Sequence, residues 1–104
     1  MSVKVTPLEM QFLTDMTCSC HTTDGHGIVM WLTPAYCSIP MNQARAVAVS
    51  LQSKGIIALD PADPRYAQNP DWYLPGHVSV LDAFQEKDEN ARGGYRLANI
   101  EVSA

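Results

Sequence analysis

The 104-residue chain is 46% hydrophobic and 17% charged, with a formal net charge of −4. This length allows one domain with one hydrophobic core and leaves no room for separate catalytic and regulatory domains. The longest apolar stretches are far shorter than the roughly 20 residues that a membrane-spanning helix needs. We therefore expect a single domain over residues 1–104 that is not embedded in a membrane.

The charges and cysteines indicate where such a protein works and what it binds. The first residues, MSVKVTPLEM, lack the apolar run of a signal peptide, and three cysteines without an export signal favour free thiols in the cytoplasm. Residues 1–54 carry three basic and three acidic side chains, whereas residues 55–104 carry four basic and eight acidic ones. The sequence shows no basic patch of the kind that usually supplies affinity for nucleic acid.

The first predicted element is a helix from about Pro7 to Thr17. The segment Thr6-Pro7-Leu8-Glu9 matches a capping box, with proline at the first helical position. Apolar residues then recur every four positions, at Leu8, Phe12 and Met16.

The middle of the chain predicts a second helix and a strand. Ile28–Leu32 is apolar throughout and fits either a short buried helix or a short strand. A helix from about Pro40 to Lys54 is indicated by helically spaced apolar residues, which are Met41, Ala44, Val47, Ala48 and Leu51. Gly55 is suited to end this helix, and the β-branched run Ile56–Leu59 predicts a strand.

The last part predicts a loop and a hairpin. Residues 60–76 contain four of the seven prolines, which is typical of an irregular loop. His77–Gln85 and Gly94–Val102 both read as strands, and the polar turn between them indicates that they pair as one long hairpin.

This order of elements resembles the winged-helix (winged helix-turn-helix) domain, an α+β fold. The resemblance depends mainly on the run Leu51-Gln52-Ser53-Lys54-Gly55-Ile56-Ile57 between the second helix and its strand. It implies helices packed on a small antiparallel sheet, with the C-terminal β-hairpin as the wing. Together with Thr6–Glu9 and Gly94–Leu97, this run is similar to small phage and prophage proteins of winged-helix type. The chain departs from them in its Pro-rich loop and after Leu97, where they continue into a further helix.

The resemblance implies a DNA-binding transcriptional regulator, with a homodimer as a possible state. In such a protein the second helix enters the major groove, where amide side chains read adenine and arginine reads guanine. The candidate DNA-binding residues on this helix are Asn42, Gln43, Arg45 and Ser50. Candidate contacts to the DNA backbone are Lys54, Lys87, Arg92 and Arg96. Alternatively, the polar residues only solvate the helix and Arg45 covers apolar surface with its stem.

A second hypothesis is an inhibitor or adaptor that binds a host or phage protein. Ala46 and Val49 on the outer face of the second helix suit a protein partner better than a DNA groove. The loop aromatics Tyr66, Trp72 and Tyr73 are residue types enriched at interface hot spots, although aromatics in a long loop also commonly cover a small core. The acidic second half of the chain could mimic nucleic acid toward a basic protein.

Metal binding and catalysis receive less support from the sequence. Zinc ligands are available among Cys18, Cys20, His21, His26 and Cys37, but Cys-x-Cys-His is not a usual ligand spacing. The chain contains no phosphate-binding loop, nucleophile elbow or His-Glu-x-x-His motif. We therefore predict a protein without a metal or other cofactor that binds rather than catalyses.

Overall fold

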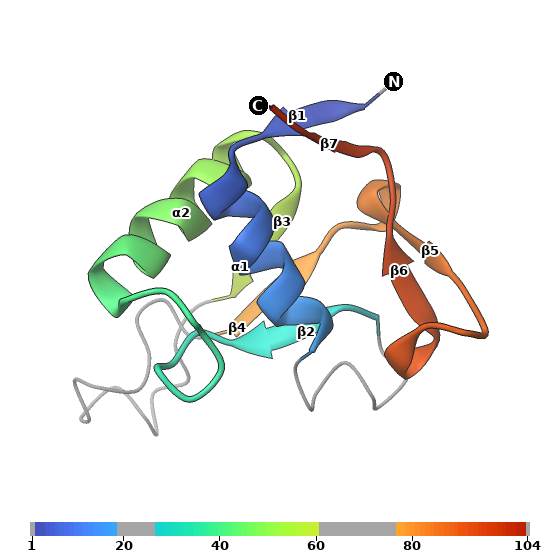
Figure 1. Ribbon diagram of the computed structural model, residues 1–104, viewed down its shortest axis with the longest axis horizontal. Helices are drawn as coiled ribbons and strands as arrows, with labels where there is room; N and C mark the ends of the chain where they lie inside the picture. The colour runs from blue at the N-terminus through green and yellow to red at the C-terminus, as the bar shows by residue number, and fades with distance from the viewer. Residues whose placement is uncertain (1, 19–26, 61–76, 104) are drawn as a thin grey trace.

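A computed structural model describes residues 2–18, 27–60 and 77–103, which form an α+β fold as the sequence predicts (Figure 1). The described helices are α1 (Pro7–Thr17) and α2 (Met41–Ser53). The described strands are β1 (Val3–Val5), β2 (Val29–Trp31), β3 (Ile57–Asp60), β4 (His77–Val80), β5 (Gln85–Lys87), β6 (Tyr95–Leu97) and β7 (Ile100–Val102). None of the described helices is long and apolar enough to cross a membrane.

Helix α1 begins with the predicted capping box. The N–H of Glu9 donates to Thr6 Oγ1 at 3.1 Å, and the N–H of Thr6 donates to Glu9 Oε1 at 2.8 Å. The helix buries its apolar face through Phe12, Leu13 and Met16. Leu8, which the four-residue spacing places on that face, is instead 42% exposed, whereas Glu9 is buried. The buried face of α1 is therefore rotated from the predicted position toward Glu9, whose side chain points to α2.

Helix α2 and its end also match the prediction. Its inward face consists of the buried residues Ala44, Val47, Ala48 and Leu51. Beyond Lys54, Gly55 takes a φ of +76°, a left-handed conformation that costs glycine little. The N–H of Gly55 donates to Gln52 O at 3.0 Å, and the N–H of Ile56 donates to Leu51 O at 3.1 Å. These two bonds make a Schellman motif, which directs the chain from α2 into β3.

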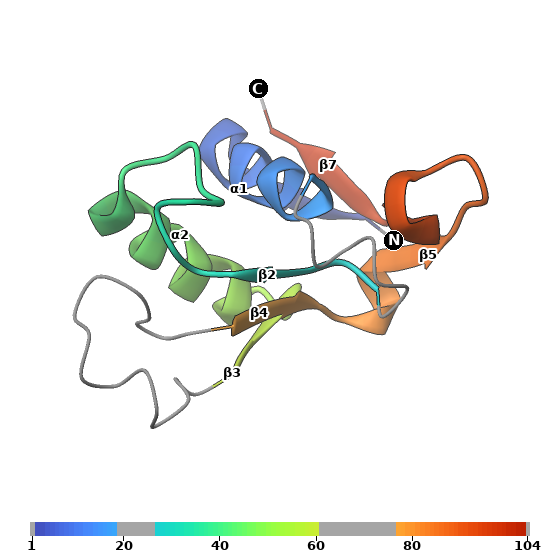
Figure 2. The ribbon, with the colours of Figure 1, turned by 90° about the horizontal axis from the view of Figure 1, so that it is seen from below.

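The central sheet is antiparallel and has the order β2–β4–β3, with the two helices covering one of its faces (Figure 2). The apolar run Ile28–Leu32 is thus a strand with its flanks. The inward residues of the sheet join the helix residues in one core and include Met30, Ile57, Val78 and Val80. On the other face, the rings of Trp31 and His77 meet edge to face, with centroids 5.1 Å apart.

The prediction that residues 77–102 form one long C-terminal hairpin is wrong. His77–Val80 pairs with β2 and β3 in the central sheet, and a 3-10 turn at Asp82–Phe84 then ends the strand. A shorter hairpin joins β5 to β6, in the register Gln85↔Leu97. The sequence shows strand propensity here, but propensity does not identify the partner of a strand. The apolar residues of β4 bury more surface in the central sheet than they would in an isolated hairpin, so β4 completes the core.

Strand β7 also has a partner that the sequence does not indicate. Asn99, with a φ of +60°, lies in the turn after β6, and β7 then runs parallel to β1 near the other end of the chain. The register places Val3 beside Ile100, Lys4 beside Glu101 and Val5 beside Val102. The two ends of the described chain therefore lie side by side (Figure 1).

Candidate functional site

The first turn of α2 presents two of the predicted DNA-binding residues to solvent. Asn42 and Gln43 are both exposed. Arg45 is half-buried, and its Nε is buried without a hydrogen-bond partner among the described residues. Arg45 is therefore less open to a partner than its two neighbours on the helix. Asn42 and Gln43 remain accessible to a partner of any kind.

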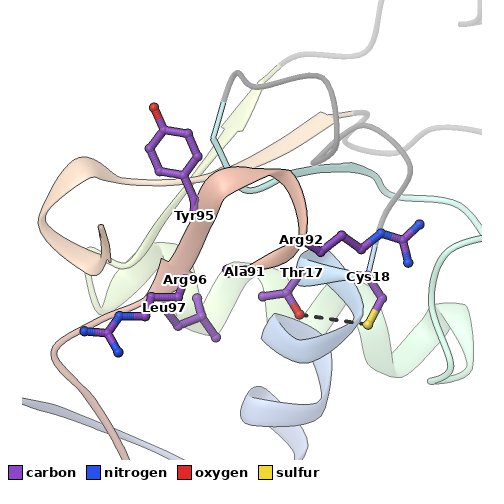
Figure 3. A pocket seen from close by; sticks show the side chains of 7 residues that line it. All are labelled: Thr17, Cys18, Ala91, Arg92, Tyr95, Arg96 and Leu97. Carbon is purple, nitrogen blue, oxygen red and sulfur yellow. Dashed lines mark hydrogen bonds between the residues drawn. The ribbon is translucent and has the colours of Figure 1, made fainter. Parts of the chain in front are cut away.

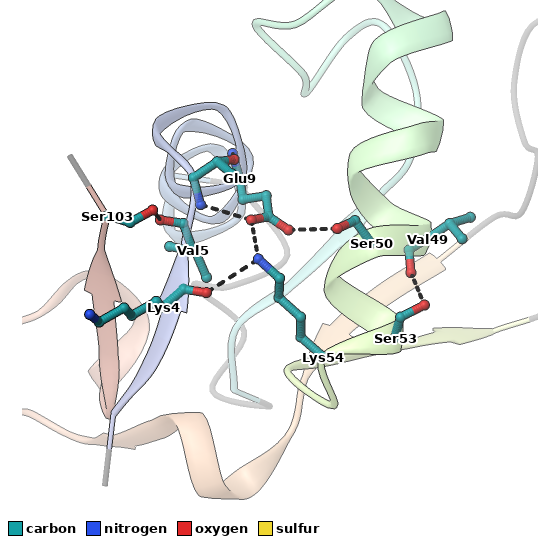
Figure 4. Close-up of polar contacts among 9 residues, drawn as sticks. Lys4, Val5, Glu9, Val49, Ser50, Ser53, Lys54 and Ser103 are labelled. Atoms are coloured by element: carbon teal, nitrogen blue, oxygen red, sulfur yellow. Dashed lines mark hydrogen bonds and ion pairs between the residues drawn. The ribbon is translucent and has the colours of Figure 1, made fainter.

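The C-terminal half of α2 holds its two predicted contacts in a polar cluster with α1 (Figure 4). Glu9 Oε2 accepts a hydrogen bond from Ser50 Oγ at 2.8 Å. Glu9 Oε1 forms an ion pair of 2.6 Å with Lys54 Nζ. Lys54 Nζ also donates to the backbone oxygen of Lys4 at 3.2 Å. Lys54 therefore ties the end of α2 to both α1 and β1.

This cluster keeps a carboxylate charged although its side chain is only 4% exposed. Burial alone would raise the pKa of Glu9, but the hydrogen bonds from Lys54, from the Thr6 N–H and from Ser50 outweigh it and lower that pKa. The charge of Lys54 is thus satisfied inside the molecule. A phosphate contact by Lys54 would have to compete with the ion pair to Glu9.

The β5–β6 hairpin carries the other predicted cations. Arg96 forms ion pairs with Glu86 and, at 3.9 Å, with Asp88. Arg92 and Lys87 are exposed, and neither forms an ion pair within the described part of the chain. The β5–β6 hairpin thus combines acidic and basic side chains and does not form a uniformly basic surface.

A shallow pocket lies between the end of α1 and this hairpin (Figure 3). Its volume is about 290 Å³, at the lower limit of typical small-molecule sites. It is lined by Thr17, Cys18, Ala91, Arg92, Tyr95, Arg96 and Leu97. Most of this lining is apolar, and Arg92 and Arg96 supply its cations. Arg92, Arg96 and Cys18 were candidate residues for other roles, but the pocket itself was not predicted, because its residues meet only through the packing of the hairpin against α1.

The remaining predicted sites lie partly or wholly outside the described residues. Tyr66, Trp72 and Tyr73 are outside them, as are the possible zinc ligands Cys20, His21 and His26. Among residues 2–18, 27–60 and 77–103, no group of three or more His, Cys, Asp or Glu side chains could hold a metal ion.

The two described cysteines differ in environment. Cys18 is exposed at the end of α1, whereas Cys37 is half-buried in the connection between β2 and α2. Burial, with the nearby charge of Asp15, raises the pKa of the Cys37 thiol to about 11. Because zinc binds the thiolate, this environment disfavours Cys37 as a ligand.

Comparisons of the chain with protein-family models, with curated proteins and with solved structures found no match.

Proposed function

We propose that this chain is a non-catalytic binding protein of winged-helix type whose partner is another protein. The order of helices and strands along the chain supports the winged-helix class. A strand between the two helices is followed, after α2, by two further strands, and the last of these lies at the centre of an antiparallel sheet.

The observation that supports a protein partner is the exposed apolar side chain of Val49 on the outer face of α2. Val49 is 54% exposed there, next in helical position to the exposed residues Ala46 and Ser53. An exposed valine next to an exposed alanine gains free energy when another apolar surface covers both. It gains little against the phosphate-lined groove of DNA.

The cations support the same choice. DNA affinity depends largely on lysine and arginine side chains that neutralise phosphates. Of the predicted phosphate contacts, Lys54 is paired with Glu9 and Arg96 with Glu86. Only Lys87 and Arg92 of that set lack an ion pair within the described residues.

Photo-crosslinking from the outer face of α2 tests this proposal. A photoreactive amino acid replaces Val49 in the full chain, which is expressed in the cells from which its gene comes. We expect discrete crosslinked proteins that an added Asn42→Asp substitution, about two helical turns earlier on the same outer face, depletes. The matched control carries the same group at the exposed residue Asn90, in the turn between β5 and β6. Equal products from both positions, or none from position 49, would reject a protein partner on α2.

DNA binding remains the second candidate because α2 has no acidic side chain and exposes Asn42 and Gln43 at its first turn. A mobility shift on random duplex at ~50 mM salt should then appear at micromolar protein and disappear steeply as salt rises. The double variant Asn42→Ala, Gln43→Ala should reduce discrimination between sequences. Absence of any shift at low salt would eliminate this candidate.

A further inference from the structure

The β1–β7 pair is an incomplete sheet. It has two parallel strands of three residues each, whereas parallel strands usually lie inside larger sheets that are covered on both faces. Its apolar face is only partly covered, because Val5 is fully buried but Val102 is 47% exposed. The exposed side of the pair is therefore the side of β7.

The hydrogen bonds show which backbone groups of β7 point outward. The N–H of Val3 donates to Asn99 O at 2.9 Å, and the N–H of Ser103 donates to Val5 O at 2.8 Å. Because the bonding direction alternates along a strand, the N–H and C=O groups of Ile100 and Val102 point away from β1. No described residue bonds to these outward groups.

The opposite edge of the pair is already occupied. The backbone oxygen of Lys4 faces α2, where it accepts a hydrogen bond from Lys54 Nζ. Figure 4 shows β1 lying between α2 and the strand that carries Ser103. An added strand can therefore join this small sheet only along β7.

The side chains of β7 define the chemistry of such a strand. Glu101 is exposed and forms no ion pair with any described residue. In an antiparallel addition, the residue directly opposite Glu101 comes close to it, and opposite charges at such a position are favourable whereas like charges are not. A second copy of β7, paired symmetrically about this position, would place one Glu101 beside another.

We propose that the free edge of β7 accepts an extended segment of a partner protein, in which a lysine or arginine opposite Glu101 is flanked by apolar residues. The chain itself contains an example of this pattern. Val3-Lys4-Val5 pairs with the inner edge of β7 and places Lys4 beside Glu101. This mode of recognition combines backbone hydrogen bonds for affinity with alternate side chains for specificity. The proposal specifies the partner chemistry of the protein-binding function proposed above and rests on it.

The test uses two synthetic peptides, Val-Lys-Val-Lys-Val and Val-Glu-Val-Glu-Val, with the full chain followed by NMR. We expect the lysine peptide to shift the amide resonances of Ile100 and Val102 and to bind more tightly than the glutamate peptide. Glu101→Lys should reverse that preference. Shifts confined to other residues, or equal binding of the two peptides, would overturn the proposal.

Val102→Pro tests the backbone contact itself. Proline removes an outward N–H but no bond to β1, and proline is tolerated on edge strands in this position. With one hydrogen bond lost, peptide binding should weaken about three- to tenfold. The matched control Val102→Thr keeps the N–H and the β-branch and should bind as the wild type does. Unchanged binding by Val102→Pro would contradict strand addition.

The outcomes separate this proposal from the proposed function. If crosslinking from position 49 captures a protein but neither peptide binds, the protein-binding function stands and the β7 site is rejected. If the lysine peptide binds β7 but no protein is captured, the edge is competent and the function proposed for α2 is rejected. Concentration-dependent dimerisation of the wild type, abolished by Val102→Pro, would identify a second copy as the occupant and overturn the partner that we propose.

Discussion

The described residues before and after Val80 are built in different ways. Every buried hydrophobic side chain among them lies between Val5 and Val80, in the helices, the central sheet or their flanks. Between Leu81 and Ser103 the described residues are exposed or half-buried. This later region attaches to the core through partly buried residues, which are Phe84, Tyr95, Leu97 and Ile100.

The comparison indicates a division between stability and recognition. A buried core dominates folding free energy, whereas regions with few buried contacts open locally at lower cost. The region after Leu81 also contains both the β5–β6 hairpin, with its mixed charges, and the free edge of β7. It can therefore differ in sequence or adapt to a partner without loss of the core, and the predictions below test that division.

The largest expected effect is a core truncation. Leu51→Ala removes a fully buried side chain of α2 and should lower the free energy of unfolding by about 2–5 kcal/mol. Leu97→Ala, in half-buried β6, should lower it by about 1 kcal/mol, since less apolar area is lost. Urea denaturation followed by circular dichroism measures both. Equal losses would show that the later region is as integral to the core as α2.

The next effect comes from the polar cluster between the helices. Lys54→Met should cost about 2 kcal/mol, because it leaves the carboxylate of Glu9 buried with fewer donors. Glu9 has a pKa below its usual 4.5, so its contribution is complete above that pH and declines as pH falls through the lowered pKa.

The pH dependence is the control for this variant. The difference in unfolding free energy between wild type and Lys54→Met should therefore be constant near neutral pH and shrink below about pH 4.5. Urea titrations at neutral and acidic pH measure it. A difference that does not change with pH would mean that lost packing of the Lys54 stem, rather than the charge of Glu9, causes the destabilisation.

The same comparison explains how much of the structure can be predicted from sequence. The helices, their ends and the strand after α2 follow from local signals, namely the capping box of Thr6 and Glu9, the apolar spacing and Gly55. The partners of β4 and β7 do not follow, because strand propensity is local whereas pairing depends on distant residues. For β7 that partner is β1, almost the whole chain away.

The candidate site shows the same limit. The exposure of Asn42 and Gln43 follows from their place on α2, opposite the apolar stripe. The burial of Glu9 has a partial signal, because a capping box predicts one of its hydrogen bonds. The contacts of Glu9 with Ser50 and Lys54 require the packing of the two helices, which the pattern of either helix alone does not specify.

A smaller effect is expected where the two regions meet. The side chain of Gln85 accepts from the Ile28 N–H at 2.8 Å and donates to Val80 O at 2.9 Å. Gln85→Ala would leave the N–H of buried Ile28 unpaired and should cost about 1–2 kcal/mol. The loss should appear as faster amide exchange at Ile28. If exchange there is unchanged, water replaces the Gln85 oxygen and the junction is looser than the distances indicate.

The smallest effect should come from Arg96→Ala in the hairpin. Its side chain is 60% exposed, and solvent-exposed ion pairs such as Arg96–Glu86 contribute about 0–1 kcal/mol. Thermal denaturation should therefore barely change, and added salt should shrink what difference from wild type there is. A loss as large as that of Gln85→Ala would require the Leu81–Ser103 region to fold cooperatively with the core through its surface charges. In that case the hairpin could not vary independently, and recognition and stability would share the same residues.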